Sequence, residues 1–150
     1  MTTKAAVEDF VSQRTLAVVG VSSGGKKFGN AACRDLRAKG YRIIPVHPTA
    51  ESINGERCYR SLSELPEPVG GVLVVVPPAE TEKVVREAAA AGIKRIWMQQ
   101  GAQSAAAIQF CQDQGLSVIH NECILMFAEP VRGGHRFHRF IWRVLGKLPG

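Results

Sequence analysis

The sequence predicts an α/β fold in which helices cover both faces of a mainly parallel sheet of five strands. The first observation is a pattern that occurs three times: a stretch with helical character, then a glycine, then a short apolar run. Glycine just past a helix supplies the left-handed backbone conformation that closes the last turn. The expected pairs of helix and strand are 30–39 with 41–46, 80–91 with 93–98, and 104–114 with 116–120.

The second observation concerns two further runs, 16–19 and 72–76, which are almost wholly apolar. Strands that are covered on both faces have this composition, and helices between strands imply parallel pairing. Right-handed crossovers then produce a Rossmann-like, doubly wound sheet. In such a sheet a ligand is expected at the carboxyl ends of the strands.

The remaining segments complete this organisation. Residues 3–13 carry apolar side chains at helical spacing, which predicts a short leading helix packed on the sheet. Residues 49–68 are polar and include two prolines, which predicts an irregular connection with one helical turn at 61–65. We therefore divide the chain into a domain at 1–130 and a basic amphipathic C-terminal helix at 131–150.

Composition and length indicate an ordinary globular protein. The 150 residues are 45% hydrophobic and 21% charged, which suits one soluble domain. The first ten residues carry acids and lack the continuous apolar core of a signal peptide. The longest apolar run is too short to span a bilayer. We expect a cytoplasmic protein.

The four cysteines are dispersed through the chain, at Cys33, Cys58, Cys111 and Cys123. They form no C-x-x-C pair, so the sequence favours neither a zinc site nor a disulfide framework. We expect small buried residues in a reducing compartment. A role for Cys123 as a nucleophile, or in a mixed disulfide, is the alternative, but its apolar surroundings favour burial.

The chemistry of the chain is predicted to lie first in the turn after the strand at 16–19. This turn, GVSSGGKKFG at 20–29, is rich in glycine and is followed by a helix. Such a turn lets the backbone approach an anion and points unpaired N–H groups at a phosphate. A surface loop without a ligand is the alternative interpretation.

Three classes of phosphate ligand compete for this turn. The spacing at 20–26 resembles a P-loop, but Lys27 stands where that motif needs Ser or Thr for Mg²⁺. An NAD site needs an acid at the end of the second strand. Here that strand ends in IPVHP at 44–48, which contains no acid. The G-x-G-x-x-G spacing is absent too. The interpretation as an NADP-binding or other nucleotide-binding protein that acts with a partner remains an alternative.

The third class follows from the strand ends taken together. AVVGVSS at the first turn, GYRIIPVHP at the second strand, VLVVVPP at the third, WMQQG at the fourth and VIHNECILM at the close occur in order. With these pieces, residues 16–126 resemble the small CoA-binding proteins related to the N-terminal domain of the succinyl-CoA synthetase α subunit. The resemblance implies a Rossmann-like fold and coenzyme A, free or acylated, as the ligand.

The resemblance also implies roles for residues at four strand ends. The glycine-rich turn would hold the CoA diphosphate, with a lysine adding charge. The second strand end would wall the adenine–ribose part, the third would form a platform that the cofactor crosses, and the fourth would line the exit for the pantetheine arm. In this order the residues are Gly20, Val21, Ser22, Lys26 and Lys27; Val46, His47 and Pro48; Val76, Pro77 and Pro78; and Gln99, Gln100 and Gly101. For the prolines, the alternative role is to begin the following helix.

The sequence departs from the synthetase in its catalytic parts. The synthetase α subunit needs a second domain with a phosphorylated histidine, and we expect no counterpart of it here. None of the four histidines is flanked by a nucleophile and an acid in a triad order. We therefore predict a protein that binds CoA or acyl-CoA without catalysis.

The basic segment carries five of the positive charges, at Arg132, Arg136, Arg139, Arg143 and Lys147. Removing these five from the formal net charge of +6 leaves about +1 for the rest of the chain. Residues 135–148 have apolar and basic side chains on different faces, which predicts an amphipathic helix. It would dock on the sheet or on a second subunit of a homodimer, or contact a membrane or another protein. Nucleic acid is the weaker alternative, because only Trp142 lies on the basic side.

Overall fold

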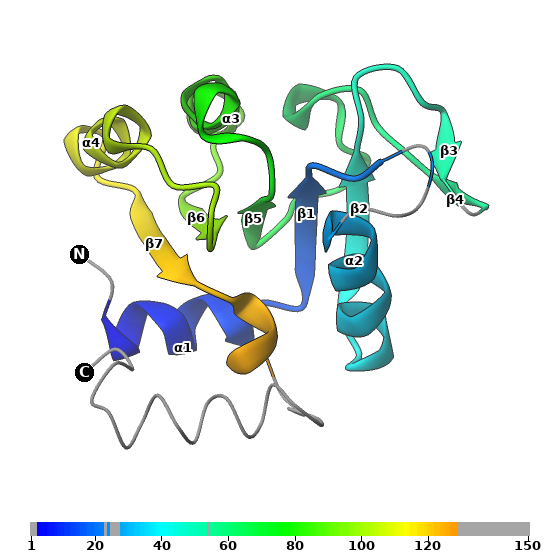
Figure 1. Ribbon diagram of the computed structural model, residues 1–150, viewed down its shortest axis with the longest axis horizontal. Helices are drawn as coiled ribbons and strands as arrows, with labels where there is room; N and C mark the ends of the chain where they lie inside the picture. Colours follow the sequence, from blue (N-terminus) through cyan, green and yellow to red (C-terminus); the bar gives the residue numbers. More distant parts are fainter. Residues whose placement is uncertain (1–2, 23, 25–27, 54, 129–150) are drawn as a thin grey trace.

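A computed structural model describes residues 3–22, 24, 28–53 and 55–128. Its centre is one parallel sheet in the order β2-β1-β5-β6-β7 (Figure 1). The strands are β1 (Thr15–Val19), β2 (Arg42–Val46), β5 (Gly71–Val74), β6 (Arg95–Gln99) and β7 (Ser117–Glu122). Every neighbouring pair runs parallel. The Rossmann-like, doubly wound fold predicted from the sequence is therefore confirmed.

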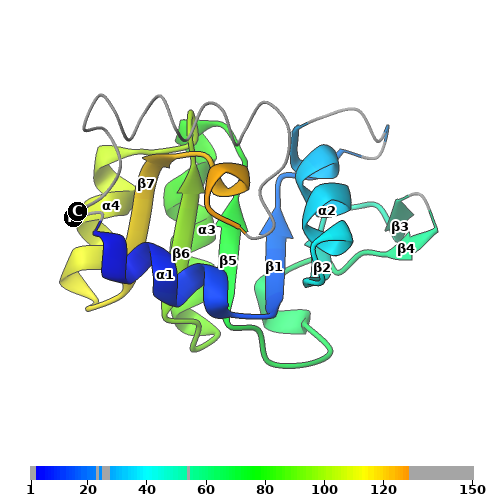
Figure 2. The same cartoon turned by 90° about the horizontal axis from the view of Figure 1, so that it is seen from below.

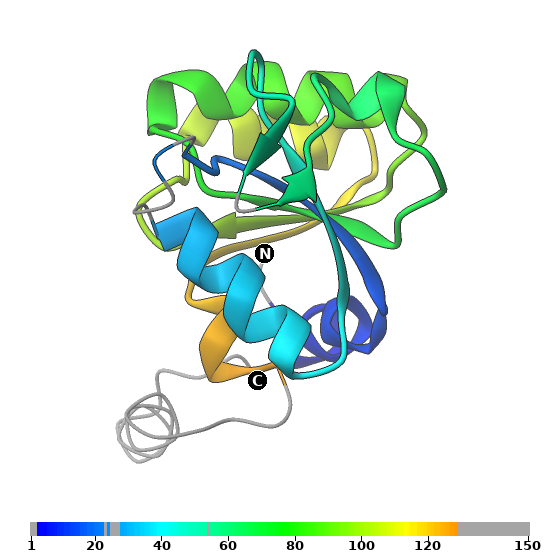
Figure 3. The same ribbon diagram turned by 90° about the vertical axis from the view of Figure 1, so that its right-hand side faces the viewer.

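Helices cover both faces of this sheet. The helices α1 (Lys4–Ser12) and α2 (Phe28–Ala38) lie on one face, together with the short turn η2 (Ile124–Met126) (Figure 2). The helices α3 (Pro78–Ala90) and α4 (Ala105–Asp113) lie on the other, so that the three layers are seen edge-on in Figure 3. Because both faces are covered, the central strands β1 and β5 have no polar side, which explains their almost wholly apolar sequences.

Alternate residues of each strand supply two separate apolar cores. Leu16 and Val18 of β1 pack toward α1 and α2, whereas Ala17 between them packs toward α3 and α4. The largest buried side chain is Trp97 of β6, whose ring centroid lies 5.3 Å from that of Phe10. Its indole Nε1 donates to the Glu122 carbonyl at 3.0 Å, so the ring is both packed and hydrogen-bonded.

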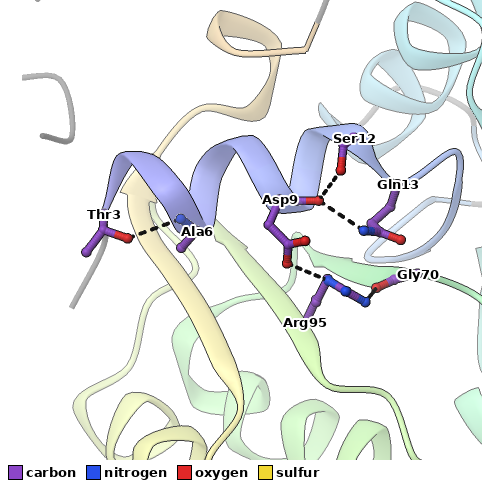
Figure 4. A network of polar contacts seen from close by, with 7 residues as sticks. All are labelled: Thr3, Ala6, Asp9, Ser12, Gln13, Gly70 and Arg95. Atoms are coloured by element: carbon purple, nitrogen blue, oxygen red, sulfur yellow. Dashed lines mark hydrogen bonds and ion pairs between the residues drawn. The ribbon is translucent and has the colours of Figure 1, made fainter.

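The leading helix predicted at 3–13 is α1, and it is fastened to the sheet at the amino ends of the strands (Figure 4). Arg95 Nε donates to Asp9 Oδ2 at 2.6 Å, and the same guanidinium donates to the Gly70 carbonyl at 3.3 Å. Gly71 follows Gly70, and Phe10 packs so closely on it that a Cβ at Gly71 would lie 2.5 Å from the Phe10 ring. A glycine is therefore required where α1 crosses β5.

The connection predicted at 49–68 has more structure than expected. The helical turn is present as η1 (Leu62–Glu64), but a two-stranded hairpin precedes it, formed by β3 (Ser52–Ile53) and β4 (Glu56–Arg57). Strands of two residues are too short to show a period in the sequence. The hairpin projects beyond β2, at one end of the molecule (Figure 1).

The start of α3 differs slightly from the prediction, and the predicted C-terminal helix is not described by the structure. The helix predicted to begin at residue 80 begins at Pro78, whose missing N–H costs nothing in a first turn. The basic segment at 131–150 lies outside the described residues, and so do Lys26 and Lys27.

Candidate functional site

A cavity of about 310 Å³ lies at the carboxyl ends of β1, β2 and β5. The connections from β1 and from β5 leave toward opposite faces of the sheet, through α2 and α3 respectively. The crevice between such strands is the usual binding place of doubly wound sheets. The cavity is lined by three strand ends, by the segment after β4 and by one face of α3. In this order the residues are Val19, Gly20 and Val21 at the end of β1; Val46, His47 and Pro48 at the end of β2; Val75, Val76 and Pro77 at the end of β5; Arg60 and Leu62; and Glu80, Lys83, Val84 and Glu87.

The turn after β1 is held very close to its neighbours. Gly20 has a φ of +125°, and a Cβ on it would collide with the carbonyl of Val75 beyond β5. A Cβ on Gly29, in the first turn of α2, would lie 2.6 Å from the Gly20 carbonyl oxygen. Two glycines therefore allow the backbone of this turn to pass between β5 and α2.

Asn30 fixes the same turn and was not among the predicted site residues. Its buried amide accepts from the Ser22 N–H at 2.8 Å and donates to the Ser22 carbonyl at 3.0 Å. The Ser22 N–H is therefore occupied, while the Ser22 hydroxyl oxygen accepts from Gly24 N at 3.2 Å and keeps its own hydrogen for another partner. A polar residue in the first turn of the helix after a glycine-rich loop is the signal that could have identified Asn30.

At the end of β2, His47 has a defined hydrogen-bonding role. Its Nδ1 accepts from Thr49 N at 3.1 Å and from Ala50 N at 2.8 Å, which closes the turn after the strand. An imidazole that accepts at Nδ1 carries its hydrogen on Nε2. The His47 side chain can therefore offer a neutral donor to a ligand. The expected neighbours Val46 and Pro48 also line the cavity.

At the end of β5, Val76 and Pro77 line the cavity as expected, whereas Pro78 is not among the lining residues. Pro78 instead occupies the first turn of α3, the alternative role for a proline at this point. The next lining residues come from α3 itself: Glu80, Lys83, Val84 and Glu87, at i, i+3, i+4 and i+7, share one face of the helix. Reasoning from the strand ends alone did not find this wall.

The segment 59–62 forms another wall that the sequence analysis missed. Tyr59 N donates to the Pro45 carbonyl at 3.0 Å, and His47 N donates to the Tyr59 carbonyl at 2.8 Å. At the other end of the segment, Leu62 N donates to Glu87 Oε1 of α3 at 2.6 Å. These bonds connect β2 to α3 across the cavity, and Arg60 lies between them.

The residues at the end of β6 lie apart from this cavity. Gln99 is buried, and its Oε1 accepts from Ile124 N at 3.0 Å, which ties the strand end to η2. Gln100 and Gly101 are exposed and form the turn toward α4. Nearby, at the end of β7, Glu122 Oε2 is buried and has no hydrogen-bond partner within the described parts of the chain. Burial raises the pKa of this carboxyl to about 7.

All four cysteines are free and buried. Burial raises the pKa of the Cys33 and Cys111 thiols to about 11, and it raises the pKa of Cys58 as well. A thiol in this state is a poor nucleophile at neutral pH. Over the ranges that the structure describes, no three His, Cys, Asp or Glu side chains come together as metal ligands do. Within those ranges there is also no helix with the length and hydropathy of a membrane span.

Fold and cavity together define a Rossmann-like ligand-binding domain, and the sequence identifies its family. Residues 14–129 match the model of the CoA binding domain, so the chain belongs to the CoA-binding domain family. The resemblance found in the motifs at the strand ends is thereby confirmed.

Relatives of this chain are both small proteins and parts of larger enzymes. The chain is 29% identical over 122 residues to the uncharacterized protein YneT of Bacillus subtilis, covering 81% of this chain and 90% of that protein. It is 30% identical over 88 residues to the α subunit of the ADP-forming acetate–CoA ligase II of Pyrococcus furiosus. That match covers 58% of this chain and 19% of the subunit, so the matched segment corresponds to about a fifth of the ligase subunit.

Solved structures give the same result. A hypothetical protein from Pyrococcus horikoshii OT3 superposes with a TM-score of 0.80 and 26% identity, covering 88% of this chain and 94% of that one. A conserved hypothetical protein from Pyrococcus furiosus superposes with a TM-score of 0.70 and 40% identity, covering 74% of this chain and 96% of that one.

Proposed function

We propose that this protein binds CoA or an acyl-CoA in the cavity at the ends of β1, β2 and β5, and that it performs no chemistry on its own. One observation carries the proposal: in a chain of the CoA-binding domain family, the cavity lies where the connections leave β1 and β5 toward opposite faces of the sheet. A doubly wound sheet binds nucleotides at this point.

In this proposal the diphosphate lies against the turn after β1. Gly20 and Val21 line the cavity, and the Ser22 hydroxyl retains a hydrogen to donate. The close packing of Gly20 and Gly29 holds the backbone of this turn in place at the end of β1, where an anion would approach it. Lys26 and Lys27, which belong to the same turn, add positive charge.

The adenosine part then lies between Val46, His47 and Pro48 at the end of β2. A neutral His47 imidazole that donates from Nε2 is compatible with a phosphorylated ribose there. The carboxylate of an NAD site would instead repel the phosphate on that ribose. The pantetheine arm crosses Val76 and Pro77. Its reactive end points toward the turn at 99–101.

The absence of catalysis is part of the same proposal. The match to the acetate–CoA ligase α subunit covers only 19% of that subunit, so it accounts for only part of such an enzyme. Among the carboxylates of the cavity, Glu87 already accepts a hydrogen bond from Leu62 N. The thiols of Cys33, Cys58 and Cys111, whose pKa is raised by burial, are unsuited to attack an acyl group.

Calorimetric titration of the full chain with CoA, acetyl-CoA, NAD, NADP and ATP tests the proposal. We expect heat of binding with the two CoA compounds and none with NAD. Tighter binding of NADP or ATP, or no binding of any CoA compound, would refute it. Two half-buried valines that flank β5 at opposite ends give a matched pair of variants. Val76→Asp places an acid in the cavity and should weaken CoA binding about tenfold or more, whereas Val69→Asp should leave it unchanged.

A further inference from the structure

Two cations, Arg60 and Lys83, line the proposed cavity and were found by the structure alone. Arg60 belongs to the segment after β4, and Lys83 belongs to α3, so they come from two different walls. Both side chains are exposed. Among the described residues, neither forms a salt bridge, although five other salt bridges are present.

The backbone that carries Arg60 is fixed on both sides. Tyr59, the residue before it, exchanges hydrogen bonds with Pro45 and His47 of the β2 end. Leu62, two residues after it, donates to the Glu87 carboxylate of α3. Arg60 is therefore held in place by the same bonds that connect two walls of the cavity, and only its side chain must be ordered when a ligand binds.

Lys83 is positioned by the helix. It lies one turn from Glu80 and one turn from Glu87, on the face of α3 that lines the cavity. The Glu87 carboxylate already accepts the Leu62 N–H at 2.6 Å, so part of its charge is engaged there. Glu80 is exposed, in the first turn of α3. The ammonium of Lys83 is thus available to a ligand.

We propose that Arg60 and Lys83 together bind a phosphate monoester, and that this group is the 3′-phosphate that distinguishes CoA from dephospho-CoA. A phosphate monoester offers three acceptor oxygens and close to two negative charges, which suits a guanidinium and an ammonium on adjoining walls. The two residues determine the selectivity of the cavity rather than its ability to bind the rest of the molecule. This inference rests on the function proposed above.

Calorimetric titration with CoA and with dephospho-CoA, at one low salt concentration, tests the pair. The variants are Arg60→Gln, Lys83→Gln and the double variant. Lys94→Gln, just before the amino end of β6, is the control for loss of one exposed charge. For the unmodified protein we expect CoA to bind about tenfold or more tightly than dephospho-CoA. Each single variant should lose part of this preference, and the double variant should bind both compounds about equally. Affinity for dephospho-CoA should stay within about twofold throughout, and Lys94→Gln should behave as the unmodified protein.

The outcomes separate this inference from the proposed function. If CoA binds but the preference is absent, or survives in the double variant, the assignment of Arg60 and Lys83 is wrong and the proposed function stands. If both compounds lose affinity equally in the double variant, the cations hold the diphosphate, and the assignment is again wrong. If neither compound binds the unmodified protein, the proposed function itself fails.

Discussion

Removal of the Asn30 amide is the perturbation that best connects the fold to the site. Asn30 is buried and makes two hydrogen bonds with the backbone of Ser22, at 2.8 and 3.0 Å. Each bond contributes about 1 kcal/mol of net stability, and truncation also leaves two backbone groups without their partner. Because Ser22 is only partly buried, water can reach some of what is exposed. We expect Asn30→Ala to lower the free energy of unfolding by about 2 kcal/mol.

The effect on binding should exceed what stability alone would give. Without the amide, the turn after β1 must be ordered when the ligand binds, and this ordering costs affinity. Asn30→Asp retains the acceptor for the Ser22 N–H but replaces the donor with an oxygen that faces the Ser22 carbonyl. It also adds a negative charge beside the turn that we assign to the diphosphate. We therefore expect Asn30→Asp to reduce CoA affinity more than Asn30→Ala does.

Urea denaturation and calorimetric titration with CoA measure the two effects on the same samples. Gln109→Ala is the control, because it removes a side-chain amide from an exposed pair with Asp113 on α4, away from the cavity. Its stability and CoA affinity should change little. An Asn30→Ala protein that keeps both its stability and its CoA affinity would refute the role of this amide as the anchor of the turn.

Three further predictions concern single positions. Glu122 keeps its proton up to about pH 7 in the folded protein, whereas the ordinary pKa of this group is 4.5. Between these pH values the folded state binds more protons than the unfolded state, so the protein loses stability as the pH rises. Glu122→Gln should therefore gain stability over the unmodified protein between pH 4.5 and 7, reaching up to about 3 kcal/mol above pH 7 in urea denaturation, with the exposed Glu8→Gln as the control. His47→Asp can still accept from Thr49 N and Ala50 N, but its carboxylate should weaken CoA binding about tenfold and favour NAD in calorimetry. Gly29→Ala sets a methyl 2.6 Å from a backbone oxygen and should lower the free energy of unfolding by about 1–3 kcal/mol in thermal denaturation monitored by circular dichroism.

The sheet and its covering helices could be predicted because their signals are local. Apolar runs, together with Gly40, Gly92 and Gly115 past the helices, gave the order of elements, and positive φ angles at these three glycines agree with the expected closing turns. Element ends moved by only a few residues, as at Pro78, where the helix begins two residues early. The hairpin before η1 was missed because two-residue strands carry no periodic pattern.

The site was predictable only in the part that follows the strand ends. Gly20, Val46, His47 and Pro77 meet in one cavity because the carboxyl ends of parallel strands share one edge of the sheet. The other walls depend on contacts between distant segments, such as the bond from Leu62 to Glu87 across 25 residues, and no local pattern reports them. Gln99 shows the converse, since a polar residue at a strand end looks available in the sequence and yet serves Ile124 in the structure.

The polar groups of the cavity that have no partner among the residues described indicate what kind of ligand the cavity accepts. The amide of Asn30, the Nδ1 of His47 and one oxygen of Glu87 each hold a neighbouring turn. Within the described part of the chain, the lining side-chain groups left for a ligand are the Nε2 hydrogen of His47, the cations Arg60 and Lys83, the exposed Glu80 and the second oxygen of Glu87. Apart from the two carboxylates these are all donors. Donors on three walls of the cavity match a ligand rich in acceptor oxygens. The same arrangement therefore supports the proposal of a phosphorylated ligand.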